Sequence, residues 1–308
     1  MNPRGWPVFF LSLCLGGCAG FEVQPGPGEA GLPASAGSVP FQSYESLHFV
    51  VRARDYSLAR DVAESSEEIY RKVMFDTNLL SFKPRESYRV TIYEDRDQYR
   101  DLTGNPDWSG GVTTTLLLGR GIPGEREEKA RTSIATYEEV LTPRLMAHEI
   151  VHLVFNEFME FADARIAERV RWLNEGLATF EELEYCSESE RSEFFRMTQP
   201  LLRKHAQPLP RVMSANPFLE SASALGSYSA GGRSVLYTNI DVWYWQSRSL
   251  VEFLILDHGR YNFYLFMEAL KRGRPVEDAL RDAYPGKWGG LGDLESEWRG
   301  SAALRRDG

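Results

Sequence analysis

Cysteine, histidine and clustered positive charge are all scarce in this sequence. Its 308 residues contain three cysteines and five histidines, and the formal net charge is −9. No run of lysine and arginine interrupts this acidic balance. Because nucleic-acid binding normally requires a basic patch, we expect no nucleic-acid partner. The hydrophobic content of 43% is nevertheless sufficient to bury a substantial core.

The N-terminus lacks an apolar run long enough to span a membrane. The apolar stretch Trp6–Leu15 follows a positive charge at Arg4 and is shorter than the roughly 20 residues that a membrane-spanning helix needs. This pattern is typical of a secretory signal peptide, which we place at residues 1–17. Its end, Leu15-Gly16-Gly17-Cys18, resembles a bacterial lipobox, in which cleavage leaves a lipidated cysteine as the first mature residue.

We therefore predict that Cys18 carries a lipid anchor that tethers the protein to a membrane of the cell envelope. Ala19 after this cysteine is the pattern of outer-membrane sorting, so in a Gram-negative cell we expect the periplasmic face of the outer membrane. Cys14 leaves with the signal peptide, and only Cys186 then remains as a free thiol, so no internal disulfide can form. Acidic neighbours disfavour thiolate chemistry at Cys186.

The rest of the chain divides by composition into a tether and a folded domain. Residues 18–40 are rich in Gly, Pro, Ala and Ser and show no apolar periodicity, which indicates a tether. We expect the folded domain at residues 41–303, with an N-terminal α/β subdomain at about 41–160 and a helical C-terminal subdomain at about 161–303. The predicted fold class is α+β, a small mixed sheet followed by mainly helical structure.

Hydrophobic periodicity predicts the individual elements. Alternating apolar residues predict strands at Leu47–Arg52, Tyr88–Tyr93, Val112–Leu118 and Thr132–Tyr137, the last two paired with each other. Helical spacing predicts a helix from Leu58 to Val73 and another that begins at Pro143. Later helices are predicted at about 163–185, 190–204, 245–257, 261–271 and 275–284, divided by a Ser/Gly-rich stretch from Ser214 to Gly232.

The sequence His148-Glu149-Ile150-Val151-His152 is the strongest indication of function, because it predicts a metal site. Residues four apart share a helical face and lie about 5–6 Å from each other, so both imidazoles can reach one metal ion. Apolar neighbours indicate that this helix is buried, where unpaired His and Glu side chains would be costly. A catalytic zinc ion takes three protein ligands and one water. We therefore predict one Zn²⁺, held in part by His148 and His152.

Glu175, in the sequence Trp172-Leu173-Asn174-Glu175-Gly176-Leu177-Ala178, is the predicted third ligand. The interval after His152 permits a turn and a second helix that packs against the first. Ala178 and Thr179 share the face of Glu175 and leave room for the ion, and Gly176 removes bulk beside it. The alternative third ligands are Glu181, Glu182 and Glu184.

The two motifs together resemble the gluzincin metallopeptidases, specifically the peptidase MA-like family. Weaker similarity lies at Trp108–Val112 and at Tyr244–Leu250 followed by Asp257–Gly259, so the resemblance covers about residues 44–300. It implies a zincin-like fold with an active-site helix, and Glu175 as the third zinc ligand. The stretch from Ser214 to Asp241 is longer than the resemblance implies.

The expected function is zinc-dependent hydrolysis of peptide bonds in the cell envelope. Glu149 is expected to accept a proton from the zinc-activated water and to pass it to the leaving amine. The resemblance also points to Tyr244 as a donor to the tetrahedral oxyanion, with helix packing beside Trp243 and Trp245 as the alternative role. A substrate peptide is expected to add to the sheet edge along Val112–Leu118.

Two other functions are compatible with the same residues. The chain could be a non-catalytic envelope lipoprotein that uses a zincin scaffold to bind protein partners. It could also be a zinc hydrolase that acts on a non-peptide amide, such as one in the cell wall. Intact metal ligands together with the general base Glu149 favour the peptidase over the scaffold.

Overall fold

The structure is a computed structural model that describes residues 41–103, 111–115, 132–160, 164–230 and 233–301. The predicted signal peptide, the lipidation site Cys18 and the tether lie outside these residues, as does Trp108. Within the described ranges, no helix combines the length and the apolar character that crossing a membrane requires.

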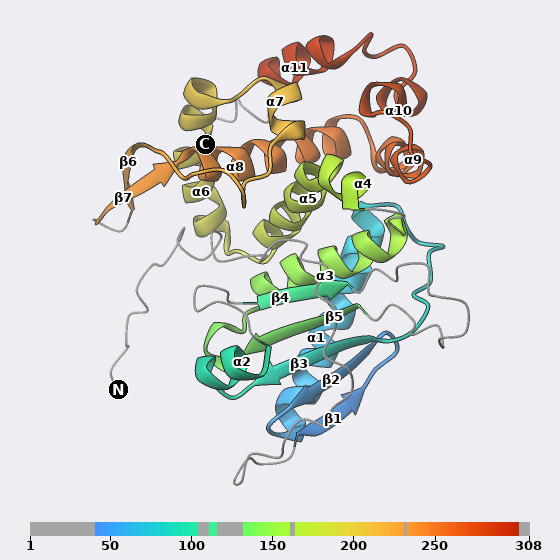
Figure 1. The fold of residues 1–308 in the computed structure, drawn as a ribbon, viewed down its shortest axis with the longest axis vertical. Coiled ribbons are helices and arrows are strands. Elements are labelled where there is room, and N and C mark those ends of the chain that lie inside the picture. Colours follow the sequence, from blue (N-terminus) through green and yellow to red (C-terminus); the bar gives the residue numbers. More distant parts are fainter. Residues whose placement is uncertain (1–40, 104–110, 116–131, 161–163, 231–232, 302–308) are drawn as a thin grey trace.

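A five-stranded mixed sheet forms one side of the molecule (Figure 1), with strand order β1-β2-β3-β5-β4. The central strands β2 (Phe49–Ala53), β3 (Tyr88–Tyr93) and β5 (Thr132–Tyr137) are parallel. β1 (Gln42–Glu45) and β4 (Gly111–Thr115) are antiparallel to their neighbours and form the two edges. The predicted bounds of β3 and β5 and the pairing of β5 with β4 are confirmed.

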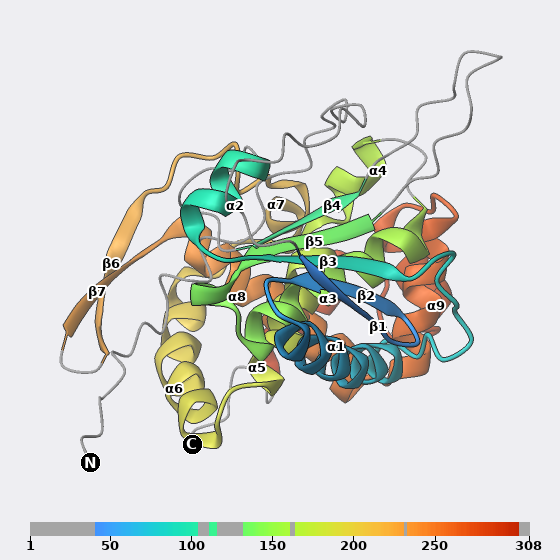
Figure 2. The same cartoon turned by 90° about the horizontal axis from the view of Figure 1, so that it is seen from below.

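Helices α1 (Tyr56–Asp76) and α3 (Pro143–Met159) cover one face of this sheet (Figure 2). α1 connects β2 to β3, and α3 follows β5 after the short helix η2 (Glu138–Val140). The N-cap residue of α3 is Thr142, whose side chain accepts a hydrogen bond of 3.1 Å from the backbone N of Leu145. Pro143 occupies the first turn as predicted, because a proline there sacrifices no intrahelical hydrogen bond.

Helices make up most of the remaining chain, and those that follow α3 lie on the side of α3 away from the sheet (Figure 1), whereas α2 packs on β3 and β5. The ligand-bearing helix of the sequence prediction, α5 (Arg171–Glu184), packs between α3 and α8 (Asn239–Glu252). The other helices are α2 (Arg96–Thr103), α4 (Ala164–Arg169), α6 (Glu188–His205), α7 (Leu209–Ser214), the π-helix η3 (Phe253–Asp257), α9 (Arg260–Lys271), α10 (Val276–Ala283) and α11 (Leu291–Gly300). The fold is therefore α+β.

The structure corrects two predictions in the helical half. The helix predicted at about 163–185 is two helices, α4 and α5. The second begins after Val170, whose carbonyl oxygen accepts hydrogen bonds from the backbone N of Leu173 and of Asn174, each at 3.0 Å. The stretch predicted to divide the helices contains a two-stranded sheet of β6 (Ala224–Ala230) and β7 (Arg233–Thr238). Four of the six residues of β6 with described burial are exposed, so this strand lacks the buried apolar face that marks a strand in sequence.

Candidate metal centre

Helix α3 places two imidazoles side by side in the interior. The ring centroids of His148 and His152 lie 4.8 Å apart at an interplanar angle of 84°. The two residues are 6% and 3% exposed. Glu149, between them in sequence, is fully buried. The apolar composition of α3 causes this burial, since the helix is enclosed by the sheet on one side and by α5 on the other.

Glu175 on α5 converges on the same point. Its Oε2 atom lies 3.8 Å from Nε2 of His148 and 3.8 Å from Nε2 of His152. The three donor atoms lie within 4.8 Å of one another, and all three residues are buried. Two ligands at about 2.1 Å from a tetrahedral ion are about 3.4 Å apart, so this spacing is close to that of a zinc site. The predicted metal-binding group is thus assembled by the fold.

The chemistry of this donor set fits a divalent cation. Oε2 of Glu175 is buried and has no hydrogen-bond partner among the residues that the structure describes. A buried carboxylate oxygen without a partner is costly, because it loses its hydration and gains nothing in return. A cation between Glu175, His148 and His152 would compensate this charge.

An acceptor oxygen lies beside Nδ1 of each imidazole, the ring nitrogen that points away from the centre and is called the outer nitrogen below. His152 donates from Nδ1 to Oδ1 of Asn174 at 2.9 Å, and Nδ1 of His148 lies 3.4 Å from Oε2 of Glu182. Asn174 in turn donates from Nδ2 to Oδ1 of Asn156 at 3.1 Å, which fixes its amide orientation. Protons held on both Nδ1 atoms leave both Nε2 lone pairs directed at the centre, the tautomer that a metal needs.

Titration behaviour reflects an excess of buried negative charge. Burial lowers the pKa of His148, but its hydrogen bond to Glu182 and the charges of Glu182, Glu149 and Glu175 outweigh burial and raise that pKa to about 9. Burial and the charge of His148 lower the pKa of His152 to about 4. Burial raises the pKa of Glu175. Of the two imidazoles, His148 is therefore the one that favours a proton when no metal ion is bound.

The three alternative third ligands have other partners. Glu182 contacts the outer nitrogen of His148 and accepts a 2.8 Å hydrogen bond from Arg144 through its other oxygen. Glu181 and Glu184 face Lys72 on α1. Sequence reasoning missed the supporting roles of Asn174, Asn156 and Arg144. The position of Asn174 directly before the predicted ligand was the only available signal for them.

Neither a family model, nor a curated protein, nor a solved structure matches the chain. The metal-site interpretation therefore depends on the residues and their geometry alone.

Gly176 has a different role from the predicted one. A Cβ atom at this position would lie 2.6 Å from the carbonyl oxygen of Ser247 and 2.9 Å from Cγ2 of Val251, both on α8. The glycine therefore permits close packing of α5 on α8 rather than space beside the metal ligand. Since the nearest atom belongs to a helix backbone, a side chain here must push the two helices apart.

We expect Gly176→Ala to lower the free energy of unfolding by about 1–3 kcal/mol, the usual cost of overpacking. Urea unfolding of the wild type and the variant measures this difference. Gly292→Ala on α11 is the matched control, because an added Cβ there meets no atom within 4 Å. Equal losses of stability in the two variants would contradict the proposed helix contact.

Two further predicted residues are located by the structure. Tyr244 lies on α8, is 7% exposed and packs edge-to-face against Trp243 with ring centroids 5.1 Å apart. This contact accounts for packing, and a catalytic role for Tyr244 stays a prediction. Cys186 is buried, and burial raises the pKa of its thiol to about 11, in keeping with an unreactive side chain.

The hydrogen bond from His152 to Asn174 gives a direct test of the supporting network. We expect Asn174→Leu to weaken zinc binding about 10- to 100-fold, because His152 loses the acceptor that orients its ring. Competition with a chromogenic zinc chelator measures the affinity. Asn174→Asp keeps an acceptor oxygen and should retain affinity within a few-fold of the wild type. An affinity unchanged in Asn174→Leu would remove Asn174 from the network.

Proposed function

We propose that this chain is a zinc metallopeptidase of the gluzincin type with a zincin-like fold. The observation that carries the proposal is the convergence of His148, His152 and Glu175, with Glu149 buried on the same helix as the two imidazoles. Two imidazole nitrogens and one carboxylate are a donor set that zinc favours, and three protein ligands leave one coordination position for solvent.

A bound zinc ion would supply a Lewis acid for water and for the scissile carbonyl. Glu149 would accept the proton of the attacking water and deliver it to the leaving amine. Asn174 and Glu182 would hold the two imidazoles in register through their outer nitrogens. Tyr244 remains the candidate donor to the oxyanion.

The position of β4 supports a proposed mode of substrate binding. This strand is an edge of the sheet, and α3, the helix with the two imidazoles, packs beside it. An extended peptide added along Gly111–Thr115 would pair by backbone hydrogen bonds and lie near the metal centre. The same proposal places the protein in the cell envelope, anchored through a lipid on Cys18.

The test is metal analysis combined with cleavage of a peptide library. We expect the purified protein to contain one zinc ion and to cut peptides, to lose this activity on chelation and to regain it with stoichiometric zinc. Bound zinc without peptide cleavage, but with cleavage of cell-wall amides, would indicate the alternative hydrolase. A protein without bound metal, or with bound metal and no hydrolytic activity, would support the scaffold.

A further inference from the structure

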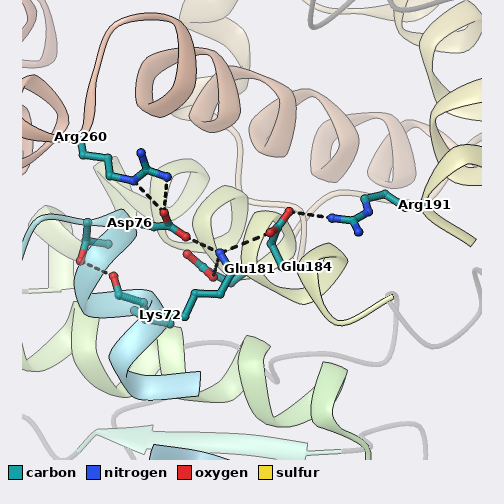
Figure 3. Close-up of polar contacts among 8 residues, drawn as sticks. Lys72, Asp76, Glu181, Glu184, Arg191 and Arg260 are labelled. Carbon is teal, nitrogen blue, oxygen red and sulfur yellow. Dashed lines mark hydrogen bonds and ion pairs between the residues drawn. The ribbon is translucent and has the colours of Figure 1, made fainter. Parts of the chain in front are cut away.

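Helix α5 carries carboxylates on two sides. Glu175 and Glu182 face the metal centre, whereas Glu181 and Glu184 face α1. On that second side a cluster of six charged residues joins four helices (Figure 3): Lys72 and Asp76 of α1, Glu181 and Glu184 of α5, Arg191 of α6 and Arg260 of α9. We call this group the α5 charge cluster.

The ammonium group of Lys72 lies within 4 Å of three carboxylates in the α5 charge cluster. Nζ of Lys72 forms an ion pair with Asp76 and lies 3.6 Å from Oε2 of Glu181 and 3.4 Å from Oε2 of Glu184. Two of the three carboxylates have a second cation. Asp76 accepts from Nε and Nη2 of Arg260 at 2.8 and 2.7 Å, and Glu184 accepts from Arg191 at 3.2 Å.

Glu181 is the carboxyl group with the least compensation. It is 0% exposed, and neither of its oxygens accepts a hydrogen bond from a donor group among the described residues. Lys72, the one cation paired with it in the described part of the chain, lies 3.6 Å away, beyond hydrogen-bonding distance, and also pairs with Asp76 and Glu184. Burying an ionised carboxylate under these conditions is costly, whereas a neutral carboxylic acid avoids most of that cost.

We propose that Glu181 retains its proton in the packed protein and that loss of this proton loosens α5 from α1. The contact of Glu181 with Lys72 and Asp76 is then a pH-sensitive latch, which holds α5, the helix that carries Glu175, against α1. The latch itself depends only on contacts of the α5 charge cluster. Its effect on Glu175 rests on the proposed metal site.

The electrostatic surroundings of Glu181 agree with this geometry. Burial is the largest effect and raises the pKa of Glu181 to about 8, while Lys72 opposes the rise and Asp76 and Glu184 reinforce it. The titratable and charged groups that face Glu181 directly or through a neighbour are Lys72, Asp76, Glu184, Tyr185, Arg260 and Arg191.

The sign of the pH dependence follows from the direction of this shift. The folded-state pKa of about 8 lies above the ordinary value of 4.5, so the folded protein binds one more proton than the unfolded chain between these values. Stability contributed by the protonated group is therefore lost as pH rises through this window. The unfolding equilibrium constant should rise about tenfold per pH unit from this group alone.

The first test compares urea unfolding of metal-stripped full chain at pH 6, 7 and 8 in the wild type and in Glu181→Gln, which cannot ionise. We expect the unfolding constant of the wild type to rise more than that of Glu181→Gln, by about tenfold from pH 6 to 7 and about fivefold from pH 7 to 8, where the slope falls near the folded-state pKa. Glu184→Gln, in the same cluster but with a 33% exposed side chain beside Arg191, should keep the wild-type slope. Equal slopes for the wild type and Glu181→Gln would overturn the proposal.

A second measurement covers the case in which Glu181→Gln does not fold. Infrared difference spectra of the wild type between pH 6 and 9 should show loss of a protonated carboxyl band near pH 8, and absence of such a band would overturn the proposal.

Zinc release then tests the link between Glu181 and Glu175. It should accelerate from pH 7 to 9 more in the wild type than in Glu181→Gln, and equal acceleration would break the link. A chain that binds no zinc would refute the proposed function. The unfolding and infrared measurements would then still test the latch, because neither requires a metal ion.

Discussion

Glu149→Gln is expected to lower kcat for peptide hydrolysis by about 10²- to 10⁴-fold while the protein still binds one zinc ion. Glutamine has nearly the same shape as glutamate, so a side chain that is 0% exposed in α3 can be replaced without a cavity. The carboxamide cannot accept a proton from water, so the variant loses the proposed base and keeps the proposed ligands His148 and His152.

Steady-state hydrolysis of a fluorogenic peptide, with zinc content measured in the same samples, checks this expectation. Glu139→Gln is the matched control, because Glu139 is exposed in η2 and contacts none of the three metal ligands in any described interaction. It should cleave at the wild-type rate. A Glu149→Gln protein with unchanged kcat would show that another group activates the water.

The sequence was sufficient to predict an element and its ends where the local apolar pattern agrees with burial in the fold. In β3, Tyr88, Val90 and Ile92 are buried and alternate with less buried residues, so the strand could be predicted with its correct ends. Helix α3 was equally clear, since Pro143 marks its start and apolar residues fill it. The spacing of His148 and His152 then fixed which side chains share a face.

Elements with weak apolar patterns escaped prediction. β1 has the sequence Gln-Ser-Tyr-Glu and is almost entirely exposed, so only its pairing with β2 identifies it as a strand. Helix α2 buries a single residue, Tyr99, and therefore shows no apolar stripe. In β6 and β7, backbone pairing forms the strands, while the small residues alanine, serine and glycine make up most of β6.

Most side-chain contacts between distant residues could not be derived from sequence. Arg260 and Asp76 are 184 positions apart, and only the packing of α9 against the end of α1 brings them together. The same holds for Gly176, whose role depends on the approach of the Ser247 backbone. The candidate metal ligands could be predicted because a helix repeat and a short motif define them, whereas their supporting contacts depend on how helices pack.

Glu175→Gln is expected to lower zinc affinity by more than about 100-fold, beyond the 10- to 100-fold typical of residues that only support a ligand. The substitution removes the one ligand charge that faces both Nε2 atoms and preserves the side-chain shape. Chelator competition measures the loss. Glu184→Gln on the same helix should bind zinc as the wild type does.

Unfolding experiments separate a ligand role of Glu175 from a structural one. Zinc that binds only the folded state stabilises it by about 4 kcal/mol at 1,000 times its dissociation constant, so the wild type should gain stability on zinc addition and Glu175→Gln should gain almost none. Without zinc, Glu175→Gln should be at least as stable as the wild type. Burial raises the pKa of Glu175, and its Oε2 has no hydrogen bond among the described residues, so the carboxylate is unfavourable there unless a cation is present. A metal-free variant less stable than the metal-free wild type would instead assign this carboxylate to packing.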